Sequence, residues 1–307
     1  MPEPFPSPAP AIVEIRRVTR HFDRRTALDD ISLTVPRGGV FGLIGGNGAG
    51  KTTLIKHILG MLKPQQGTVH VFGLDPVQNP VGTLGRIGYL SEERELPGWM
   101  RVGELLSYTQ AFFPNWDEAY ASELREAFDL DPRALIKTLS RGQRARAGLL
   151  VALAHRPDLL VLDEPSSGLD PVVRRDILGA IIRTIADEGR TVLFSSHLLD
   201  EVERVADRVA IIHQGRILLT ATMEEIKEQH RRVTLRFEEP QAQPPVLVGT
   251  LSFDGQGSEW TYVCSGERMQ LRRAAEAIGA TVVDDAALTL DEIFVTRIQS
   301  TSARSSD

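Results

Sequence analysis

The fold class that the sequence of 307 residues predicts is α/β, built on a largely parallel sheet that helices cover on both faces. Two observations predict it. Between residues 158 and 213, short apolar segments alternate with helical ones, as strands and covering helices do in a parallel sheet. Segment 101–155 instead has helical periodicity throughout, which predicts an all-helical insert in the same unit.

The elements of this unit follow in order along the chain. Its first part is β-rich, with one helix. We expect strands at 11–18, 31–35, 40–44 and 68–73, with a helix at 52–62. The insert contributes helices at 102–113, 117–128 and 144–154. After it we expect strands at 158–164, 191–196 and 208–213, with helices at 172–187 and 198–206.

The remaining chain predicts a smaller α+β appendix at 231–298. Apolar segments at 246–253 and 260–264 resemble strands, and a helix at 266–280, a strand at 281–285 and a helix at 289–298 follow. The appendix could dimerise, sense a ligand or brace the larger unit. Residues 1–11, which are rich in proline, and the Ser-rich residues 299–307 are expected to be disordered.

Composition restricts the functional classes. A hydrophobic fraction of 42% and a charged fraction of 25% are typical of a soluble globular protein. The net charge of −6 argues against a general nucleic-acid binder, so we expect no nucleic-acid partner. The single cysteine, Cys264, excludes an intramolecular disulfide and a cysteine metal site, as expected in a reducing cytoplasm. No segment approaches the roughly 18 apolar residues of a membrane span.

A phosphate-binding loop is the strongest motif in the sequence. Gly45, Gly50, Lys51 and Thr52 satisfy the pattern G-x-x-x-x-G-K-[ST] between a predicted strand and a predicted helix. Glycines let backbone N–H groups turn toward phosphates, and the helix N-terminus adds its positive end. Lys51 would bridge phosphates and Thr52 would bind Mg²⁺. A glycine loop that merely precedes a lysine is the weak alternative.

Two carboxylates end the apolar segment LLVLDE, residues 159–164. Open parallel sheets deliver such groups to the ligand crevice at the carboxyl ends of their strands. Asp163 would hold Mg²⁺ and Glu164 would act as general base toward water. Taken alone, such a pair is more often a strand end followed by helix-capping acids, but the phosphate loop favours catalysis.

A second anion-binding feature lies at LSRGQ, residues 139–143. The Ser140 hydroxyl, the Gly142 N–H and a helix N-terminus reinforced by Arg144 and Arg146 would face an anion there. Two phosphate-facing surfaces on one chain suggest a nucleotide shared between two chains. By itself, LSRGQ would be better explained as an ordinary capped helix with a solvated basic face.

LSRGQ resembles L-S-G-G-Q, the signature of the ATP-binding cassette (ABC) ATPases, and the other landmarks of that family follow in order over residues 12–225. The resemblance implies a P-loop NTPase cassette with a parallel-sheet core, an N-terminal antiparallel β subdomain and a helical subdomain at about 92–155. It also implies a homodimer, or a heterodimer with a similar ATPase, that binds two ATP molecules. Separate multi-span permease subunits would hold that dimer at the cytoplasmic face of the inner (plasma) membrane.

The family positions map onto this sequence residue by residue. Those that the resemblance places at ATP are Phe22, Gly45, Asn47, Gly48, Ala49, Gly50, Lys51, Thr52, Thr53, Ser140, Arg141, Gly142, Gln143 and Asp170. Those at Mg²⁺ are Thr52, Glu92 and Asp163, and the catalytic ones are Glu164 and His197. Phe22 could instead pack in the core, Asp170 could form a plain turn, and His197 could be a polar loop residue.

Two positions depart from the family pattern. Glu92 stands where glutamine is common, and its carboxylate can still bind Mg²⁺. Arg141 replaces the first signature glycine but keeps its backbone N–H. Segments 112–120 and 289–298 further resemble ATPase subunits of bacterial ABC-2-type exporters. The alternatives are a soluble ABC ATPase that acts on the ribosome or nucleic acid and a P-loop GTPase or kinase; the guanine motif N-K-x-D of a GTPase is missing.

Overall fold

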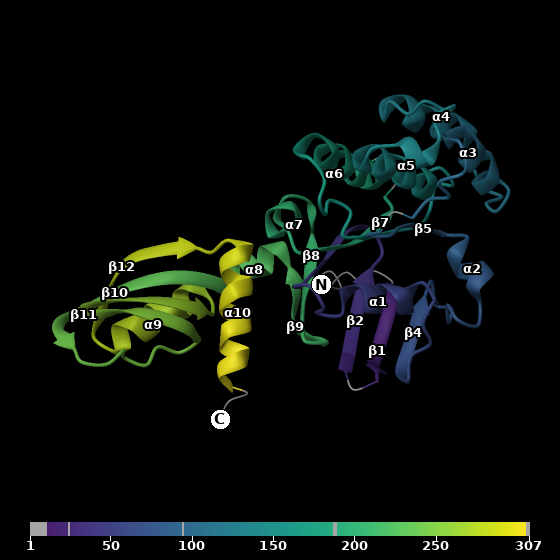
Figure 1. Cartoon of the computed structure of the whole chain (residues 1–307). Coiled ribbons are helices and arrows are strands. Elements are labelled where there is room, and N and C mark those ends of the chain that lie inside the picture. The colour runs from purple at the N-terminus through teal and green to yellow at the C-terminus, as the bar shows by residue number, and fades with distance from the viewer. Residues whose placement is uncertain (1–10, 24, 94, 187–188, 305–307) are drawn as a thin grey trace, which may run out of the picture. The chain divides into compact units, whose positions relative to one another are not determined.

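The computed structural model describes residues 11–23, 25–93, 95–186 and 189–304. The chain divides into two compact units, Met1–Thr220 and Ala221–Asp307 (Figure 1). Among the described residues, no helix combines the length and the apolar composition that crossing a membrane requires.

A six-stranded sheet forms the centre of the first unit, in the order β5-β6-β7-β3-β8-β9. Its strands are β3 (Gly39–Ile44), β5 (Ile87–Leu90), β6 (Leu159–Asp163), β7 (Thr191–Ser196), β8 (Arg208–His213) and β9 (Arg216–Thr222). Strand β3 pairs in parallel with β7 and β8, and β6 pairs in parallel with β5 and β7. All residues of β6 and β7 are buried, as expected for parallel strands covered on both faces. The parallel-sheet core predicted from the sequence is confirmed.

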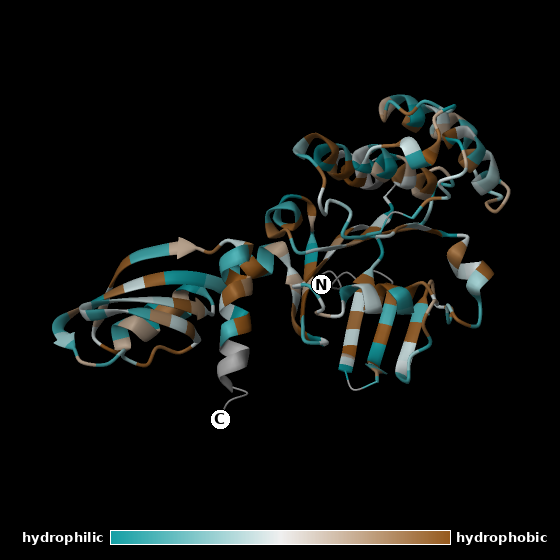
Figure 2. Ribbon diagram, in the orientation of Figure 1, coloured by the Kyte–Doolittle hydropathy of each residue, from teal (hydrophilic) through white to brown (hydrophobic). Residues whose placement is uncertain are grey.

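A second, antiparallel sheet has the order β2-β1-β4. It consists of β1 (Ala11–Phe22), β2 (Arg25–Pro36) and β4 (Gln66–Val71). These strands show alternating hydrophobic and hydrophilic bands in Figure 2, which is typical of a sheet with one buried face. Buried side chains of this sheet, the parallel sheet and helix α1 (Lys51–Ile58) form one hydrophobic core, which fixes α1 beside both sheets.

The helical insert comprises α3 (Val102–Gln110), α4 (Glu118–Ala127), a 3₁₀ turn (Ile136–Thr138) and α5 (Arg141–Leu153), which lie together in Figure 1. Ser140 caps the N-terminus of helix α5, and its Oγ accepts a hydrogen bond from Gln143 N at 3.1 Å. Ser140 N in turn donates a hydrogen bond to Gln143 Oε1 at 3.0 Å, so the two residues form a capping box. Helices α2 (Pro80–Leu84), α6 (Pro171–Ala186) and α7 (Leu199–Val205) complete the unit.

The second unit is a small α+β structure. Helix α8 (Met223–Gln229) precedes the antiparallel sheet β11-β10-β12, formed by β10 (His230–Gln241), β11 (Thr250–Ser265) and β12 (Ala280–Ala287). Helix α9 (Arg268–Ala277) buries Leu271 and Ala275 in a core that includes Trp260 and Tyr262 of β11. Helix α10 (Leu290–Arg304) ends the described chain.

Several elements differ from the sequence-based expectations. Strands β5, β9 and β10 and helices α2 and α8 were not predicted. Strand β5 has four residues and α2 five, too few to show a periodicity. Helix α1 ends at Ile58 and not at residue 62, since the chain turns at Gly60, whose φ is +69°. Strand β1 already includes residue 11, and α10 continues beyond residue 298. The expected disorder of residues 1–10 and 305–307 lies outside the described residues.

Candidate functional site

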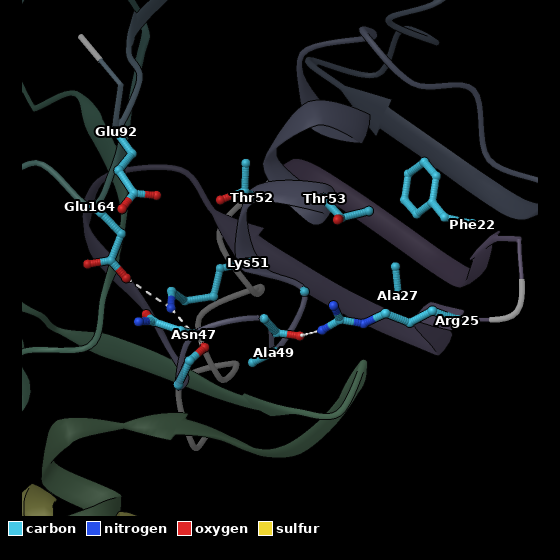
Figure 3. Close-up of a pocket in the computed structure, with 13 residues that line it drawn as sticks. Phe22, Arg25, Ala27, Asn47, Ala49, Lys51, Thr52, Thr53, Glu92 and Glu164 are labelled. Atoms are coloured by element: carbon cyan, nitrogen blue, oxygen red, sulfur yellow. Dashed lines mark hydrogen bonds and ion pairs between the residues drawn. The ribbon is translucent and has the colours of Figure 1, made fainter.

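A cavity of about 380 Å³ lies between the loop before α1 and the β1–β2 hairpin. Figure 3 shows Lys51 and Glu164 at one end of it and Phe22 and Arg25 at the other. The described residues that line it are Phe22, Arg25, Ala27, Gly46, Asn47, Gly48, Ala49, Gly50, Lys51, Thr52, Thr53, Glu92 and Glu164. Most of the predicted phosphate loop therefore faces one cavity.

The loop conformation requires glycine immediately before α1. Gly50 has a φ of +114°, which disfavours residues with a side chain. A Cβ atom at Gly50 would also lie 2.7 Å from the Ala27 carbonyl oxygen. The chain therefore enters α1 tightly, and residues 51–53 of the first helical turn line the cavity. The N–H groups of a first helical turn have no acceptor within the helix and favour an anion.

Lys51 is the buried cation of the cavity, with a relative exposure of 6%. Its Nζ donates hydrogen bonds to the carbonyl oxygens of Gly45 at 2.6 Å and Gly46 at 3.2 Å. It also lies 2.9 Å from Glu164 Oε1 in an ion pair of two buried side chains. Burying either charge without the other would be costly, so each holds the other in place.

Glu164 is fixed on several sides. Its backbone has a φ of +48°, an uncommon conformation for a residue other than glycine. Its backbone N–H donates to Ser195 Oγ at 2.9 Å, and its Oε2 accepts from His197 Nδ1 at 2.7 Å. Because a carboxylate can only accept, His197 carries the proton on Nδ1. The structure therefore brings the two predicted catalytic residues into contact.

Of the three predicted metal ligands, all of which the structure describes, Asp163 is the one that is buried and has a side-chain oxygen without a hydrogen-bond partner. It is 1% exposed, and its Oδ1 accepts a hydrogen bond from Ser195 Oγ at 2.6 Å. Its Oδ2 has no hydrogen-bond partner in the described part of the chain. A buried carboxylate oxygen without a donor suits a cation or a water bound to one. The described residues contain no cluster of three or more His, Cys, Asp or Glu that could hold a metal by itself.

The far end of the cavity is aromatic and basic. Phe22 is 42% exposed, and the Arg20 guanidinium lies 4.7 Å from its ring centroid. Arg25 donates a hydrogen bond to the Gly48 carbonyl oxygen at 2.9 Å. Arg25 and Ala27 were not predicted as site residues, because they belong to no phosphate-loop pattern and reach the cavity through the pairing of β1 with β2.

The predicted signature residues 139–143 are not among the described residues that line this cavity. They lie at the N-terminus of α5, which packs against the N-terminus of α6. A Cβ atom at Gly142 would lie 2.8 Å from Val173 Cγ2, so Gly142 is a close contact between the two helices. Asp170 Oδ1 accepts from the backbone N–H groups of Val172 and Val173, and these bonds lower the pKa of the Asp170 carboxyl.

Glu92 lies between the phosphate-loop cavity and the N-terminus of α5. It lines the cavity at the phosphate loop, and with Glu93, Arg141 and Arg144 it also lines a second hollow of about 620 Å³. Two carboxylates from the loop after β5 thus share this hollow with two guanidinium groups of α5. Glu92 is therefore placed to interact with a ligand in the cavity and with the signature helix.

The site and the fold together define a P-loop nucleotide-binding protein of the cassette type, and comparison with known proteins identifies its family. Residues 28–167 match the family model described as "ABC transporter". The daunorubicin/doxorubicin resistance ATP-binding protein DrrA of Streptomyces peucetius is 36% identical over 242 residues, covering 75% of this chain and 71% of that protein. The chain belongs to the ABC transporter family, as an ATP-binding subunit with ATPase activity.

Other relatives support the same assignment. The bacitracin transport ATP-binding protein BcrA of Bacillus licheniformis is 31% identical over 248 residues, covering 79% of this chain and 80% of that protein. A solved structure of an ATP-binding subunit of an ABC transporter superposes with a TM-score of 0.65 at 28% identity, covering 70% of this chain and 92% of that one. The predicted fold class and family are therefore confirmed.

Proposed function

We propose that this chain is the ATP-hydrolysing subunit of an ABC-2-type exporter, and that two copies bind two ATP molecules between them. The observation that carries the proposal is the separation of the two anion-binding features within one chain. Lys51 and Glu164 face the cavity, whereas the described signature residues lie elsewhere, at the beginning of α5. A second chain that places Ser140 and Gly142 over the cavity would complete the site.

The cavity provides complementary surfaces for the parts of ATP. Phe22 would stack on adenine, with the phosphates on the backbone N–H groups of residues 45–53 and on Lys51. Arg25 would face the ribose or the phosphates, since its guanidinium lies between Phe22 and the phosphate loop in Figure 3. This arrangement assigns the Phe22 end of the cavity to the base and the Lys51 end to the phosphates.

Mg²⁺ fits the oxygen donors at the phosphate end. Thr52 Oγ1 and the Oδ2 atom of Asp163 would hold it, directly or through water, together with phosphate oxygens, and Glu92 would supply a further carboxylate. The ion would neutralise phosphate charge as it develops during transfer. Hard oxygen ligands around phosphates are the usual magnesium environment.

Hydrolysis would depend on Glu164 as general base. Its Oε1 pairs with Lys51 Nζ at 2.9 Å. A γ-phosphate that entered the cavity would take Lys51 as its own partner, and Oε1 could then accept a proton from the attacking water. His197 would hold Oε2 through Nδ1, so that one carboxylate oxygen stays fixed while the other reacts.

A membrane partner would dock on the helical insert. Trp99, Tyr108 and Phe112 are 74%, 54% and 62% exposed, and all three lie at the beginning of the insert. The Tyr108 and Phe112 rings are in edge contact, with centroids 5.0 Å apart. Exposed aromatic side chains close to one another mark interaction surfaces. We therefore place the cytoplasmic part of a multi-span permease there, next to the Glu92 loop, which would hold the ATPase peripherally at the cytoplasmic face of the inner membrane.

The test is a pull-down from native-cell membranes in mild detergent. Tagged Glu164→Gln protein with ATP and Mg²⁺ should recover a multi-span membrane protein in stoichiometric amount. The matched control adds Trp99→Ser and Phe112→Ser, which should lose that partner but keep ATP-dependent dimerisation. Recovery of only ribosomes, nucleic acid or soluble proteins would overturn the transporter role.

A further inference from the structure

Arg141 makes a contact that its place in the signature does not require. The residue begins α5, and its exposed guanidinium reaches the turn after β6. There, Nη2 donates a hydrogen bond to the Ser167 carbonyl oxygen at 3.1 Å. A side chain of the helical insert thus holds the backbone of the turn that follows Glu164.

Gly168 shows how close this contact is. Its φ is +63°, and a Cβ atom there would lie 2.6 Å from Arg141 Nη2 and 2.5 Å from Arg141 Cζ. The guanidinium therefore occupies the space that any side chain at position 168 would need. Glycine at position 168 therefore both permits the positive φ of the turn and leaves room for the Arg141 guanidinium.

The same turn determines where Glu164 lies. Ser167 N donates to the Glu164 carbonyl oxygen at 3.1 Å, while Glu164 N donates to Ser195 Oγ at 2.9 Å. These bonds hold Glu164 in its unusual backbone conformation, with a φ of +48°. Such a conformation persists only where the surroundings enforce it. Ser167 is therefore the residue through which Arg141 acts on Glu164.

We propose that Arg141 is a positioning residue for Glu164 of its own chain. The inference rests on the proposed role of Glu164 as general base. It differs from the role that the family resemblance implies for position 141, where only the backbone N–H would face a nucleotide. A misplacement of about 1 Å can cost a reacting group about a hundredfold in rate, so a single hydrogen bond to this turn can control turnover.

Steady-state ATP hydrolysis by the full chain tests the proposal. Arg141→Ala and Arg141→Gly should each lower kcat about tenfold or more and leave KM within about twofold, because the turn and not the nucleotide loses its contact. Arg141→Lys can still donate one hydrogen bond and should retain an intermediate kcat. Arg125→Ala is the matched control, since it removes a guanidinium of the insert whose partner is Glu126, at 3.7 Å, and should keep the parental kcat.

A double-mutant cycle with Gly168 tests the contact itself. Gly168→Ala should displace the guanidinium and lower kcat in the parent. In the Arg141→Ala background the same substitution only strains the backbone, so it should lower kcat by a smaller factor. Equal factors in both backgrounds would show that the two positions act independently and would refute the contact.

Two further results would overturn the inference. One is an Arg141→Ala variant with parental kcat and KM. The other is an Arg141→Ala variant with parental kcat but raised KM, which would place Arg141 at the nucleotide. Glu164→Gln, measured in parallel, separates this inference from the proposed function. An inactive Glu164→Gln beside a fully active Arg141→Ala would refute the positioning role alone, whereas parental turnover by Glu164→Gln would remove the general base itself.

Discussion

Acid should destabilise the ATPase unit through one buried histidine that joins the helical insert to the central sheet. His155 lies just after α5 and is 3% exposed. Its Nε2 hydrogen-bonds to the Ile87 carbonyl oxygen of β5 at 3.1 Å, and its ring stacks on Phe113 with centroids 3.9 Å apart. Burial lowers the pKa of His155 from 6.5 to about 4.

The direction in which pH changes the free energy of unfolding follows from which state binds the proton. Below pH 6.5 the unfolded chain protonates this histidine, whereas the folded chain does so only near pH 4, so the free energy of unfolding falls as the pH falls through that window. At 1.36 kcal/mol per pKa unit the complete loss is roughly 3 kcal/mol, and most of it is reached by pH 4.5. Above pH 7 the contribution is fully present.

Replacing His155 by glutamine removes the titration while keeping an N–H donor for Ile87. Urea unfolding at pH 7.5 and pH 5 would be followed by tryptophan fluorescence. Both proteins would carry Trp260→Phe, so that the emission comes from Trp99 and Trp116 of the first unit. The parent should lose about 2 kcal/mol more than His155→Gln between the two pH values, and equal losses would refute the reasoning.

Three further predictions concern the phosphate loop, the second unit and the Phe22 end of the cavity. Gly50→Ala should lower both ATP affinity and Tm, because its Cβ would lie 2.7 Å from the Ala27 carbonyl oxygen. Gly46→Ala, whose Cβ would have no atom within 4 Å, should keep the parental Tm, and equal Tm values for the two variants would contradict this. Burial raises the pKa of the Cys264 thiol to about 11, so a thiol reagent at pH 8 should label it only after unfolding in urea, and rapid labelling of native protein would be the opposing result. Phe22→Ala should weaken ATP binding roughly tenfold in a fluorescent-nucleotide titration, and an unchanged Kd would exclude stacking.

The sequence predicted the site best where the residues that bind one group lie next to one another in the chain. The phosphate loop needs glycines, a lysine and a hydroxyl within one short segment, so residues 45–53 could be identified before any fold was known. Glu164 and His197 follow the neighbouring strands β6 and β7; family order predicted each of them as catalytic, but their contact was not predicted. The structure supplies its geometry.

Contacts between distant segments could not be read from the sequence. Arg25 reaches the phosphate loop only because β2 pairs with β1 beside it, and no local pattern reports that pairing. The bond from Arg141 to Ser167 spans 26 residues and depends on the packing of α5 against the turn after β6. Strand β5 was not predicted because it has only four residues and one of them, Gly88, disfavours a strand.

The most direct test of the account is the assembly state and turnover of Glu164→Gln. Analytical ultracentrifugation of this variant, without nucleotide and with ATP and Mg²⁺, would be combined with a phosphate-release assay. Glu164→Gln should be a monomer that becomes a dimer on adding ATP and releases almost no phosphate, and adding Ser140→Arg should abolish the dimer. Hydrolysis at the parental rate, or a monomer at saturating ATP, would contradict this prediction.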